Sequence, residues 1–499
     1  MGTRRWIVML AAVTVMAVPA ACSVVEVIDE TAVVDDAPET ATEAAAGAGA
    51  FQPGPCPFEP EVAVEVECGW LAVPESRTGL SDDRIEVAVA ILRTPAADPA
   101  PDPVVFLHGG PGGVALEEHW AWLSELDRWE DHPILATRDL VLVDQRGTGH
   151  SRPVLACGED EDTDACHDRL VAAGITLAAY TTPENAADLA ALREALGYDA
   201  WNLLGSSYGT RLAAAIVRDH PEGVRSIILD GVYPLDVVPA YHAYPANTVA
   251  AFSELFDLCT EQPACEAAYG DLAVLFEEAV TETDATPGFE AYELIDAMFS
   301  AMYGTEQLVD VPWALALAAQ GGIEDALAVL DGGDGGTPRG REPDPSADAA
   351  GKFHAIECRE EHVFTEEQVV GEELARLADQ AVPGLLLESL GADVFAAVEL
   401  CRGWDVGQAA PDELLPLDTT VPALVFSGRF DPITPPLWGR QVADRLPNAT
   451  FVLLPSVSHA AVLEDACADR LLAAFLDDPT EPLDASCVAA ATPPQLRLP

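Results

Sequence analysis

The sequence predicts an α/β fold in which a mostly parallel central sheet is interrupted by a large helical cap. Two observations lead to this prediction. Short apolar, β-branched segments alternate with helical patterns from about residue 62 onward, as in a parallel sheet whose strands are joined by helices. Strand patterns then stop near residue 234 and resume only at Val421, with Ala-, Leu- and Glu-rich helical sequence between them. We place this cap at residues 235–410, after the sixth strand of the sheet.

The N-terminus has the pattern of an export signal. Arg4 and Arg5 precede the apolar run 6–18, which is too short to span a bilayer as an ordinary helix. Ala20, Ala21 and Cys22 follow, an order typical of a lipoprotein signal that is cleaved after residue 21 and lipidated on Cys22. An ordinary cleaved signal peptide is the alternative. The sequence therefore predicts an exported, extracytoplasmic protein, lipid-anchored to the cell membrane or secreted, by the general or the twin-arginine route.

The segment after this signal and the overall charge restrict the possible partners. Residues 22–55 are rich in Ala, Glu, Asp, Thr and Gly and lack periodicity, which predicts a disordered acidic tether. The 499 residues include 84 Asp and Glu against 25 Lys and Arg, for a net charge of −59. Nucleic acid is excluded as a partner, because binding phosphates requires clustered basic side chains. Membrane contact is expected only through the lipid anchor. The oligomeric state is open, with a monomer favoured.

Residues 56–234 are predicted to form the first part of the sheet domain. Their strands are short apolar runs, as expected of buried parallel strands. They are expected at 85–92, 103–107, 140–143, 201–204 and 226–229. A helix is predicted at 183–196, because Thr182 can cap it, Pro183 suits its first turn, and Gly197 can end it.

A candidate nucleophile follows one of these strands. Gly-Ser-Ser-Tyr-Gly at residues 205–209 lies between a predicted strand and a predicted helix, and this context distinguishes a nucleophile elbow from an ordinary turn. The glycines relieve crowding in the sharp turn, and the helix N-terminus favours developing negative charge. Ser207 occupies the nucleophile position, whereas its neighbour Ser206 would be misplaced.

An oxyanion produced by attack on a carbonyl has to be held by backbone N–H groups. One is expected from Tyr208, which follows the nucleophile. The other is expected from the loop His-Gly-Gly-Pro-Gly-Gly at residues 108–113, after an earlier strand, with Gly110 as the candidate donor. The same loop could be a simple turn or a phosphate loop, but it lacks the Lys-Ser/Thr of a P-loop.

The second part of the sheet domain, residues 411–499, supplies the base and the acid. Strands are predicted at 423–426 and 450–454. Asp431 follows the first and His459 follows the second, in the chain order Ser, Asp, His expected of this elbow. Asp230, at the end of an earlier strand, is the rival acid.

These motifs together carry a family resemblance. The 108–113 loop, Asp-Gln-Arg-Gly-Thr-Gly-His-Ser at 144–151, the elbow, Asp431 and His459 resemble the proline iminopeptidase-related α/β-hydrolases. Within that group the chain is similar to the tripeptidyl aminopeptidases, exported serine hydrolases of actinobacteria, over about residues 56–490. The resemblance implies the α/β-hydrolase fold and serine-nucleophile hydrolysis without cofactor or metal. Its implied partner is a peptide with a free N-terminus, from which short peptides, expected to be tripeptides, are released.

The resemblance also suggests further site residues. Apart from Cys22, the ten remaining cysteines pair by proximity and family resemblance, although sequence alone does not fix connectivity. The suggested pairs are Cys56–Cys68, Cys157–Cys166, Cys259–Cys265, Cys358–Cys401 and Cys467–Cys487. Relatives place carboxylates in the cap to bind the substrate ammonium, and Glu357 and Glu360 are the candidates here. A solvated helix face or a salt bridge beside a disulfide is the alternative interpretation of these two residues.

Three other functions remain open at this point. A carboxylesterase acting on small esters would share every catalytic residue. A proline iminopeptidase would release single N-terminal residues rather than short peptides. A non-catalytic envelope lipoprotein that binds peptides is disfavoured, because the sequence holds a full set of triad candidates.

Overall fold

The computed structural model describes residues 49–58, 64–116, 132–158, 161–332, 349–380, 382–460, 462 and 465–499. The predicted signal peptide, Cys22 and the predicted tether up to residue 48 lie outside these ranges. Residues from Gly49 to the C-terminus belong to one compact unit. In the part of the chain that is described, none of the helices has both the length and the apolar character needed to cross a bilayer.

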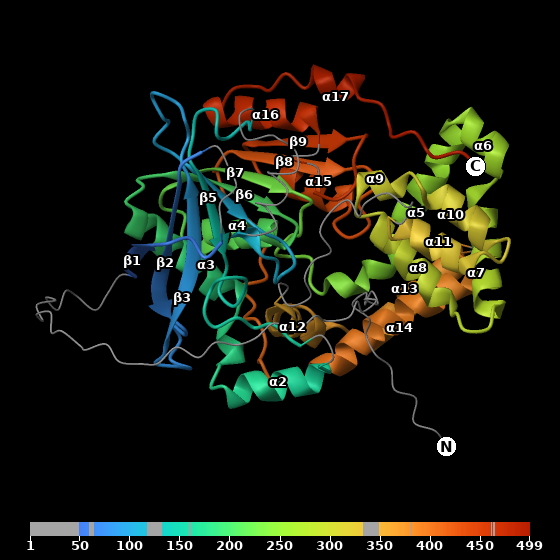
Figure 1. Cartoon of the computed structure of the whole chain (residues 1–499), viewed down its shortest axis with the longest axis horizontal. Coiled ribbons are helices and arrows are strands. Elements are labelled where there is room, and N and C mark those ends of the chain that lie inside the picture. Colours follow the sequence, from blue (N-terminus) through green and yellow to red (C-terminus); the bar gives the residue numbers. More distant parts are fainter. Residues whose placement is uncertain are drawn as a thin grey trace, which may run out of the picture. The chain divides into compact units, whose positions relative to one another are not determined.

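Nine strands of the described residues form one sheet in the order β1-β2-β3-β5-β4-β6-β7-β8-β9 (Figure 1). The pairings from β1 to β5 are antiparallel, and those from β5 to β9 are parallel. The strands are β1 Phe51–Gly54, β2 Val66–Pro74, β3 Arg84–Leu92, β4 Val104–Leu107, β5 Leu140–Asp144, β6 Trp201–Ser206, β7 Val224–Asp230, β8 Ala423–Gly428 and β9 Ala449–Leu454. The predicted α/β class with a mostly parallel sheet is therefore confirmed.

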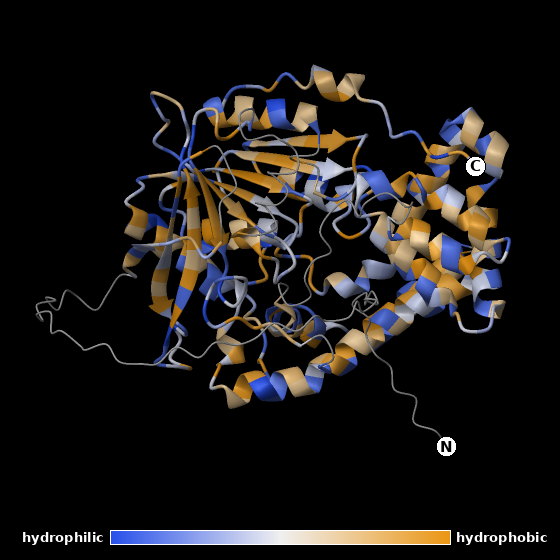
Figure 2. Cartoon of the chain, in the orientation of Figure 1, coloured by the Kyte–Doolittle hydropathy of each residue, from blue (hydrophilic) through white to orange (hydrophobic). Residues whose placement is uncertain are grey.

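Helices cover both faces of this sheet. All residues of β4, β5 and β8 are buried, and Figure 2 shows the central strands as hydrophobic. Side chains of α3, α4 and α15 pack against one face, and those of α16 pack against the other. The helices outside the cap are α2 Thr163–Ala172, η2 Leu177–Ala179, α3 Thr182–Leu196, α4 Tyr208–Asp219, α15 Pro436–Arg445, α16 Ala466–Asp477 and α17 Ser486–Ala490.

The cap consists of helices between β7 and β8, within the predicted insertion. Apolar residues of its helices form a hydrophobic core of their own, which includes Phe252, Phe276 and Met298. Its elements are η3 Ala240–His242, α5 Tyr244–Glu261, α6 Pro263–Tyr269, α7 Leu272–Ala285, α8 Ala291–Ala301, α9 Thr305–Leu308, α10 Val311–Ala318, α11 Ile323–Leu330, α12 Ala350–Glu360, η4 His362–Phe364, α13 Glu367–Ala378 and α14 Gly384–Cys401.

The structure corrects three expectations about the first half of the chain. All seven predicted strands are present, but β1 and β2 add an antiparallel edge that the sequence analysis did not predict. The cap consequently follows the seventh strand and not the sixth. The predicted tether 22–55 also extends too far, since Phe51–Gly54 pairs with β2 and the Cys56–Cys68 disulfide ties the following turn to the same strand.

Helix α3 begins one residue earlier than expected. Thr181 is its N-cap, with its hydroxyl accepting from Glu184 N, while Gly197 ends the helix in the left-handed conformation as predicted. Thr182, the predicted cap, instead hydrogen-bonds the carboxylate of Glu360 and the hydroxyl of Tyr208. Thr182 therefore forms a polar contact between the sheet domain and the cap instead of capping the helix.

The last residues of the chain pack on the cap, although they were predicted to belong to the sheet domain. After α17 the chain runs to the cap helices (Figure 1). Leu496 is buried in the core of the cap, and Gln262 Nε2 donates to Pro494 O at 2.8 Å. Tyr269 Oη donates to Arg497 O at 2.8 Å. We call residues 494–497 the C-terminal strap.

Candidate active site

Ser207 lies in a strained turn between β6 and α4. Its φ of 54° and ψ of −124° are outside the regions that ordinary residues adopt. A Cβ on Gly209 would lie 1.9 Å from Leu107 O, and one on Gly205 would lie 2.3 Å from Gly209 O. Only glycine therefore allows β4, β6 and α4 to approach so closely, and this approach presents Ser207 at the start of a helix.

Asp431 and His459 meet at the carboxyl ends of β8 and β9. His459 Nδ1 lies 2.8 Å from Asp431 Oδ2, and Asp431 is buried. Asp431 Oδ1 accepts from the backbone N–H groups of Ile433 and Thr434, at 3.0 and 2.8 Å. Thr434 Oγ1 donates to Asp431 Oδ2 at 2.6 Å and lies 3.1 Å from His459 Nδ1. These bonds hold the carboxylate in a fixed orientation, with Oδ2 facing Nδ1 of the imidazole.

The rival acid, Asp230, has a different set of contacts. It ends β7, and its Oδ2 accepts from Val462 N at 2.8 Å. It therefore braces the loop that follows His459, while the imidazole Nδ1 faces Asp431.

The glycine-rich loop 108–113 lies directly against the elbow. A Cβ on Gly109 would lie 2.9 Å from Ser207 Cβ, and Gly110 has a φ of +105°. Tyr208, the other predicted N–H donor, is the first residue of α4. Tyr208 therefore follows Ser207 in the chain, and Gly110 follows the glycine that packs against Ser207.

A buried polar network supports this loop from behind. Gln145 Nε2 donates to His108 O at 2.9 Å, and Gln145 Oε1 accepts from Lys352 Nζ at 2.7 Å and from Asn185 Nδ2 at 3.1 Å. Lys352, the only lysine of the chain, lies on cap helix α12 and is fully buried. Burial, followed by the charge of Arg146, holds the pKa of this lysine well below its ordinary value.

Ser207, His459 and the loop share one cavity of about 540 Å³ between the sheet domain and the cap. Gly109, Gly110 and Thr434 line it from the sheet domain, and Glu357 lines it from α12. Much of the remaining wall is aromatic. These aromatic residues are Phe106, Tyr233, Tyr241, Tyr244, Tyr303, Phe353 and Trp438.

Of the two predicted ammonium ligands, only Glu357 lines this cavity. Burial and the nearby charge of Glu361 raise its pKa to about 8, while Arg211 acts in the opposite direction. Glu360 does not line the cavity, and its oxygens accept from Thr182 N and Thr182 Oγ1 at 2.9 and 2.7 Å. Glu360 is therefore hydrogen-bonded to α3 and does not face the cavity in which a substrate ligand was expected.

Three further residues near the site, Glu361, Arg211 and Thr434, were not predicted from the sequence. Glu361 is buried, accepts from Ala240 N at 2.7 Å and lies 3.1 Å from the guanidinium of Arg211; burial raises its pKa to about 7. Arg211 is buried and faces the carboxylates of Glu357, Glu360 and Glu361. Thr434 could have been found from its place three residues after Asp431, where a threonine can close a turn on the aspartate.

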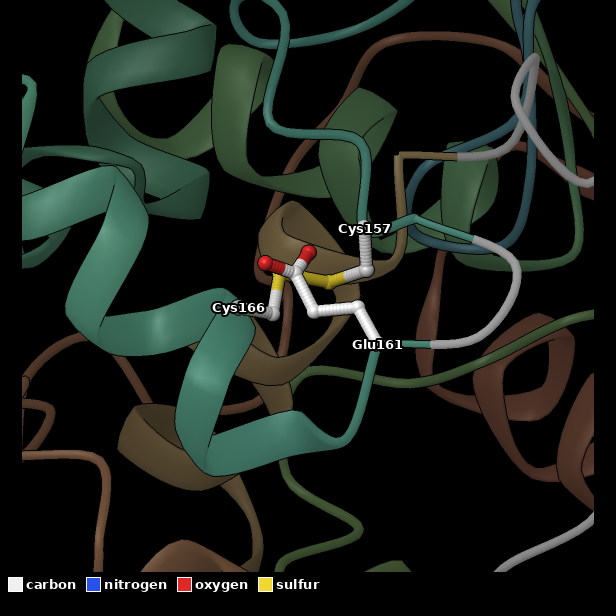
Figure 3. Close-up of side chains that lie close together, drawn as sticks. All are labelled: Cys157, Glu161 and Cys166. Atoms are coloured by element: carbon white, nitrogen blue, oxygen red, sulfur yellow. A yellow bond between two sulfur atoms is a disulfide. The ribbon is translucent and has the colours of Figure 1, made fainter.

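Five disulfides join the cysteines of the described residues in the pairs suggested by the resemblance. They are Cys56–Cys68, Cys157–Cys166, Cys259–Cys265, Cys358–Cys401 and Cys467–Cys487. Figure 3 shows Glu161 beside the sulfurs of Cys157 and Cys166, a grouping with the spacing of metal ligands. The two sulfurs are bonded to each other, and Glu161 pairs with Arg169 at 2.7 Å, which lowers the pKa of Glu161 to about 2. A disulfide and an ion pair account for this group.

Comparison with known proteins agrees with the geometry. The model of the α/β-hydrolase fold family matches residues 102–269, and the model of TAP-like proteins matches residues 388–487. Serine protease Hip1 of Mycobacterium tuberculosis is 26% identical over 463 residues, covering 83% of this chain and 86% of Hip1.

Two proline iminopeptidases are also similar to the chain. That of Neisseria meningitidis is 34% identical over 131 residues, which cover 26% of this chain and 33% of the relative. The crystal structure of the Mycobacterium smegmatis enzyme has 19% identity and a TM-score of 0.40, covering 82% of this chain and 98% of that one. The disulfides indicate an oxidising, extracytoplasmic compartment. The chain belongs to the α/β-hydrolase fold family, as a serine hydrolase of its proline iminopeptidase and TAP-like group.

Proposed function

We propose that this protein is an exported serine aminopeptidase that releases short peptides, expected to be tripeptides, from the free N-terminus of peptide substrates. The observation that carries the proposal is Glu357, a buried carboxylate in the cavity that also holds Ser207 and His459. A volume of about 540 Å³ lies within the range of ligand-binding pockets, and its aromatic walls suit the apolar parts of a short peptide.

The charge around Glu357 favours a cationic ligand. Three buried carboxylates, Glu357, Glu360 and Glu361, face Arg211. A substrate ammonium beside Glu357 would add a positive charge to this cluster and stabilise its ionised form. The amine end of a peptide would thereby be anchored at a fixed distance from Ser207.

The proposed chemistry is acyl transfer. Ser207 Oγ attacks the scissile carbonyl while His459 takes the hydroxyl proton, and the N–H groups of Gly110 and Tyr208 hold the oxyanion. His459 then gives that proton to the leaving amine as the C–N bond breaks. Water, deprotonated by His459, hydrolyses the acyl-enzyme and frees Ser207. Asp431 orients the imidazole and stabilises its charged form throughout.

The test compares matched substrates and variants. A free-amine tripeptide anilide should be cleaved well, and its N-acetylated twin poorly. In Glu357→Gln, kcat/KM for the free-amine substrate should fall about tenfold or more, as for loss of a charge-assisted bond. The same variant should keep its kcat/KM for the acetylated substrate and for a short-chain ester.

Other results would redirect the assignment. Equal cleavage of the two peptides, with faster turnover of the ester, would point to a carboxylesterase. Mass spectrometry of products from a peptide library would show whether one residue or three leave. Labelling by a fluorophosphonate should occur in the wild type and vanish in Ser207→Ala; its absence from the wild type would contradict the serine-nucleophile mechanism.

We also propose that the chain reaches its compartment as a lipoprotein anchored through Cys22. Support comes from the N-terminal sequence pattern and from an odd cysteine count that leaves this residue outside the five disulfides. Metabolic labelling with a fatty acid should mark the wild type and not Cys22→Ser. Labelling of both proteins would contradict the assignment.

A further inference from the structure

The turn that carries His459 is hydrogen-bonded to the cap. Ser458 N donates to Thr305 Oγ1 at 3.1 Å, and His459 N donates to Tyr303 O at 3.2 Å. Ser458 Oγ also donates to Met302 O. The rings of Tyr303 and His459 meet edge to face, with centroids 5.2 Å apart. We call residues 302–305, the connection after α8 together with the first residue of α9, the cap turn.

The turn that carries His459 has a strained backbone, which has to be held by contacts from outside the turn. Ala460, directly after His459, has a φ of 58°, a left-handed conformation that is unfavourable for a residue with a Cβ. Gly428 packs tightly against the turn, where a Cβ would lie 1.7 Å from Ser458 O. Strained backbone persists when surrounding contacts fix it, and three hydrogen bonds that fix this turn come from the cap.

The C-terminal strap in turn braces the segment that follows the cap turn. Arg497 N donates to Val309 O at 2.9 Å, and the Arg497 guanidinium pairs with Asp310 at 3.2 Å. The same guanidinium lies over the Trp313 ring, 3.3 Å from its centroid. Contacts therefore run without a break from the strap, through α9 and α10, to the backbone of His459.

We propose that the cap turn positions the catalytic base, with Tyr303 and Thr305 as positioning residues. This proposal rests on the proposed role of His459 in the mechanism. Asp431 and Thr434 both contact the same ring nitrogen of His459, so the tilt of the ring about that nitrogen depends on contacts elsewhere. The backbone bonds from the cap turn fix the main chain of His459, and the edge of Tyr303 restricts the ring. The cap is then a fixed part of the catalytic apparatus as well as a wall of the substrate cavity.

The experiment measures the rate at which a fluorophosphonate labels Ser207, because this reaction requires His459 but neither a peptide nor an amine. Thr305→Val should slow labelling about tenfold, since small misplacements of a catalytic group have large kinetic effects. Thr305→Ser, which keeps the hydroxyl, should restore most of the rate. Hydrolysis of a short ester should show the same loss in kcat with a nearly unchanged KM.

A second pair of variants tests the ring contact without disturbing the core. Tyr303 is 38% exposed, so Tyr303→Leu removes the ring from a partly open position. This variant should slow labelling and shift the acidic limb of the pH–rate profile, which reports the imidazole. Tyr303→Phe, which keeps the aromatic ring, should restore most of the labelling rate. Ser456→Ala is the matched control in the same loop, because Ser456 Oγ contacts Asp465 and not the cap turn.

The outcomes separate this inference from the proposed function. If the wild type is not labelled, the serine mechanism fails. If the wild type is labelled, and Thr305→Val and Tyr303→Leu are labelled at the wild-type rate with an unchanged pH profile, the positioning role is refuted. Slow labelling of Ser456→Ala to the same extent would also refute it, because any disturbance of the loop would then have the same effect.

Discussion

Thr434 contacts both the acid and the base of the proposed triad. Its hydroxyl should therefore contribute to catalysis by holding these two residues, without taking part in bond making or breaking. It donates to Asp431 Oδ2 at 2.6 Å and lies 3.1 Å from His459 Nδ1. We predict that Thr434→Val lowers kcat about tenfold, in line with the loss of one hydrogen bond to a charged group. Thr434→Ser should retain most activity. Steady-state kinetics on an ester and a peptide would check this, and an unchanged kcat in Thr434→Val would contradict it.

Glu357 and Glu361 should make the folded protein less stable as pH rises. Burial holds the pKa of Glu357 at about 8 and that of Glu361 at about 7, both above the ordinary value of 4.5. Between pH 4.5 and about 8 the folded state therefore binds more protons than the unfolded chain, and the free energy of unfolding falls with rising pH. The contribution is fully present below pH 4.5 and is lost as pH passes the folded pKa values.

Glu357→Gln removes one of these titrations, so its free energy of unfolding should decrease less than that of the wild type between pH 5 and 8. Urea unfolding at a series of pH values gives both slopes. Glu324 provides a control because its side chain is exposed on α11, and Glu324→Gln should leave the slope as it is. Parallel slopes for Glu357→Gln and the wild type would show that this carboxyl does not titrate in the window.

Among the elements, helix α4 approaches the backbone of the sheet closely at Gly209. A methyl group on Gly209 would lie 1.9 Å from Leu107 O in β4, and backbone atoms cannot move aside easily. We predict that Gly209→Ala destabilises the protein by about 3 kcal/mol, at the upper end of overpacking effects. Gly371 in α13 is the matched control, because a Cβ there meets nothing within 4 Å.

Gly371→Ala should stabilise the protein by about 0.5–1 kcal/mol, since alanine loses less backbone entropy in a helix. Chemical denaturation measures both variants. A small effect of Gly209→Ala, similar to that of Gly371→Ala, would mean that α4 can shift relative to β4 and that the elbow is not locked by this contact.

The same elements show how far the sequence determines the fold. The strands at 104–107 and 140–143 were predictable because each is a continuous apolar run, and the elbow because its Gly-Ser-Ser-Tyr-Gly sequence lies between a predicted strand and a predicted helix. Strand β2 was missed because Val66–Pro74 contains Cys, Gly and Pro, and its place depends on β3 and on a disulfide. Local sequence carries no information about such partners.

The site was predictable to the extent that it depends on local motifs. Ser207, Asp431 and His459 each follow a strand, so their positions could be inferred one at a time. The contact between Thr305 and Ser458 joins residues 153 positions apart, and nothing near either residue signals it. The choice between Glu357 and Glu360 likewise depends on which face of α12 meets Thr182, a question of tertiary packing.

Over the whole molecule, the charge is the property most exposed to solution conditions. The net charge of −59 results from 84 Asp and Glu against 25 Lys and Arg. Many of the arginines are already paired with individual carboxylates. The surplus carboxylates repel one another in the folded state more than in the expanded unfolded chain. Added salt screens this repulsion, since the Debye length falls from about 30 Å at 0.01 M to about 8 Å at 0.15 M.

We therefore predict that the melting temperature rises with sodium chloride at pH 7.5, mostly below about 0.15 M, where screening changes fastest. Differential scanning calorimetry measures the rise. Sorbitol at equal osmolality should give little increase, because it does not screen charge. At pH 4, where about half of the exposed carboxylates are protonated, the salt effect should shrink. A melting temperature that increases evenly up to molar salt, with the same slope at both pH values, would instead identify general exclusion of salt from the protein surface as the cause.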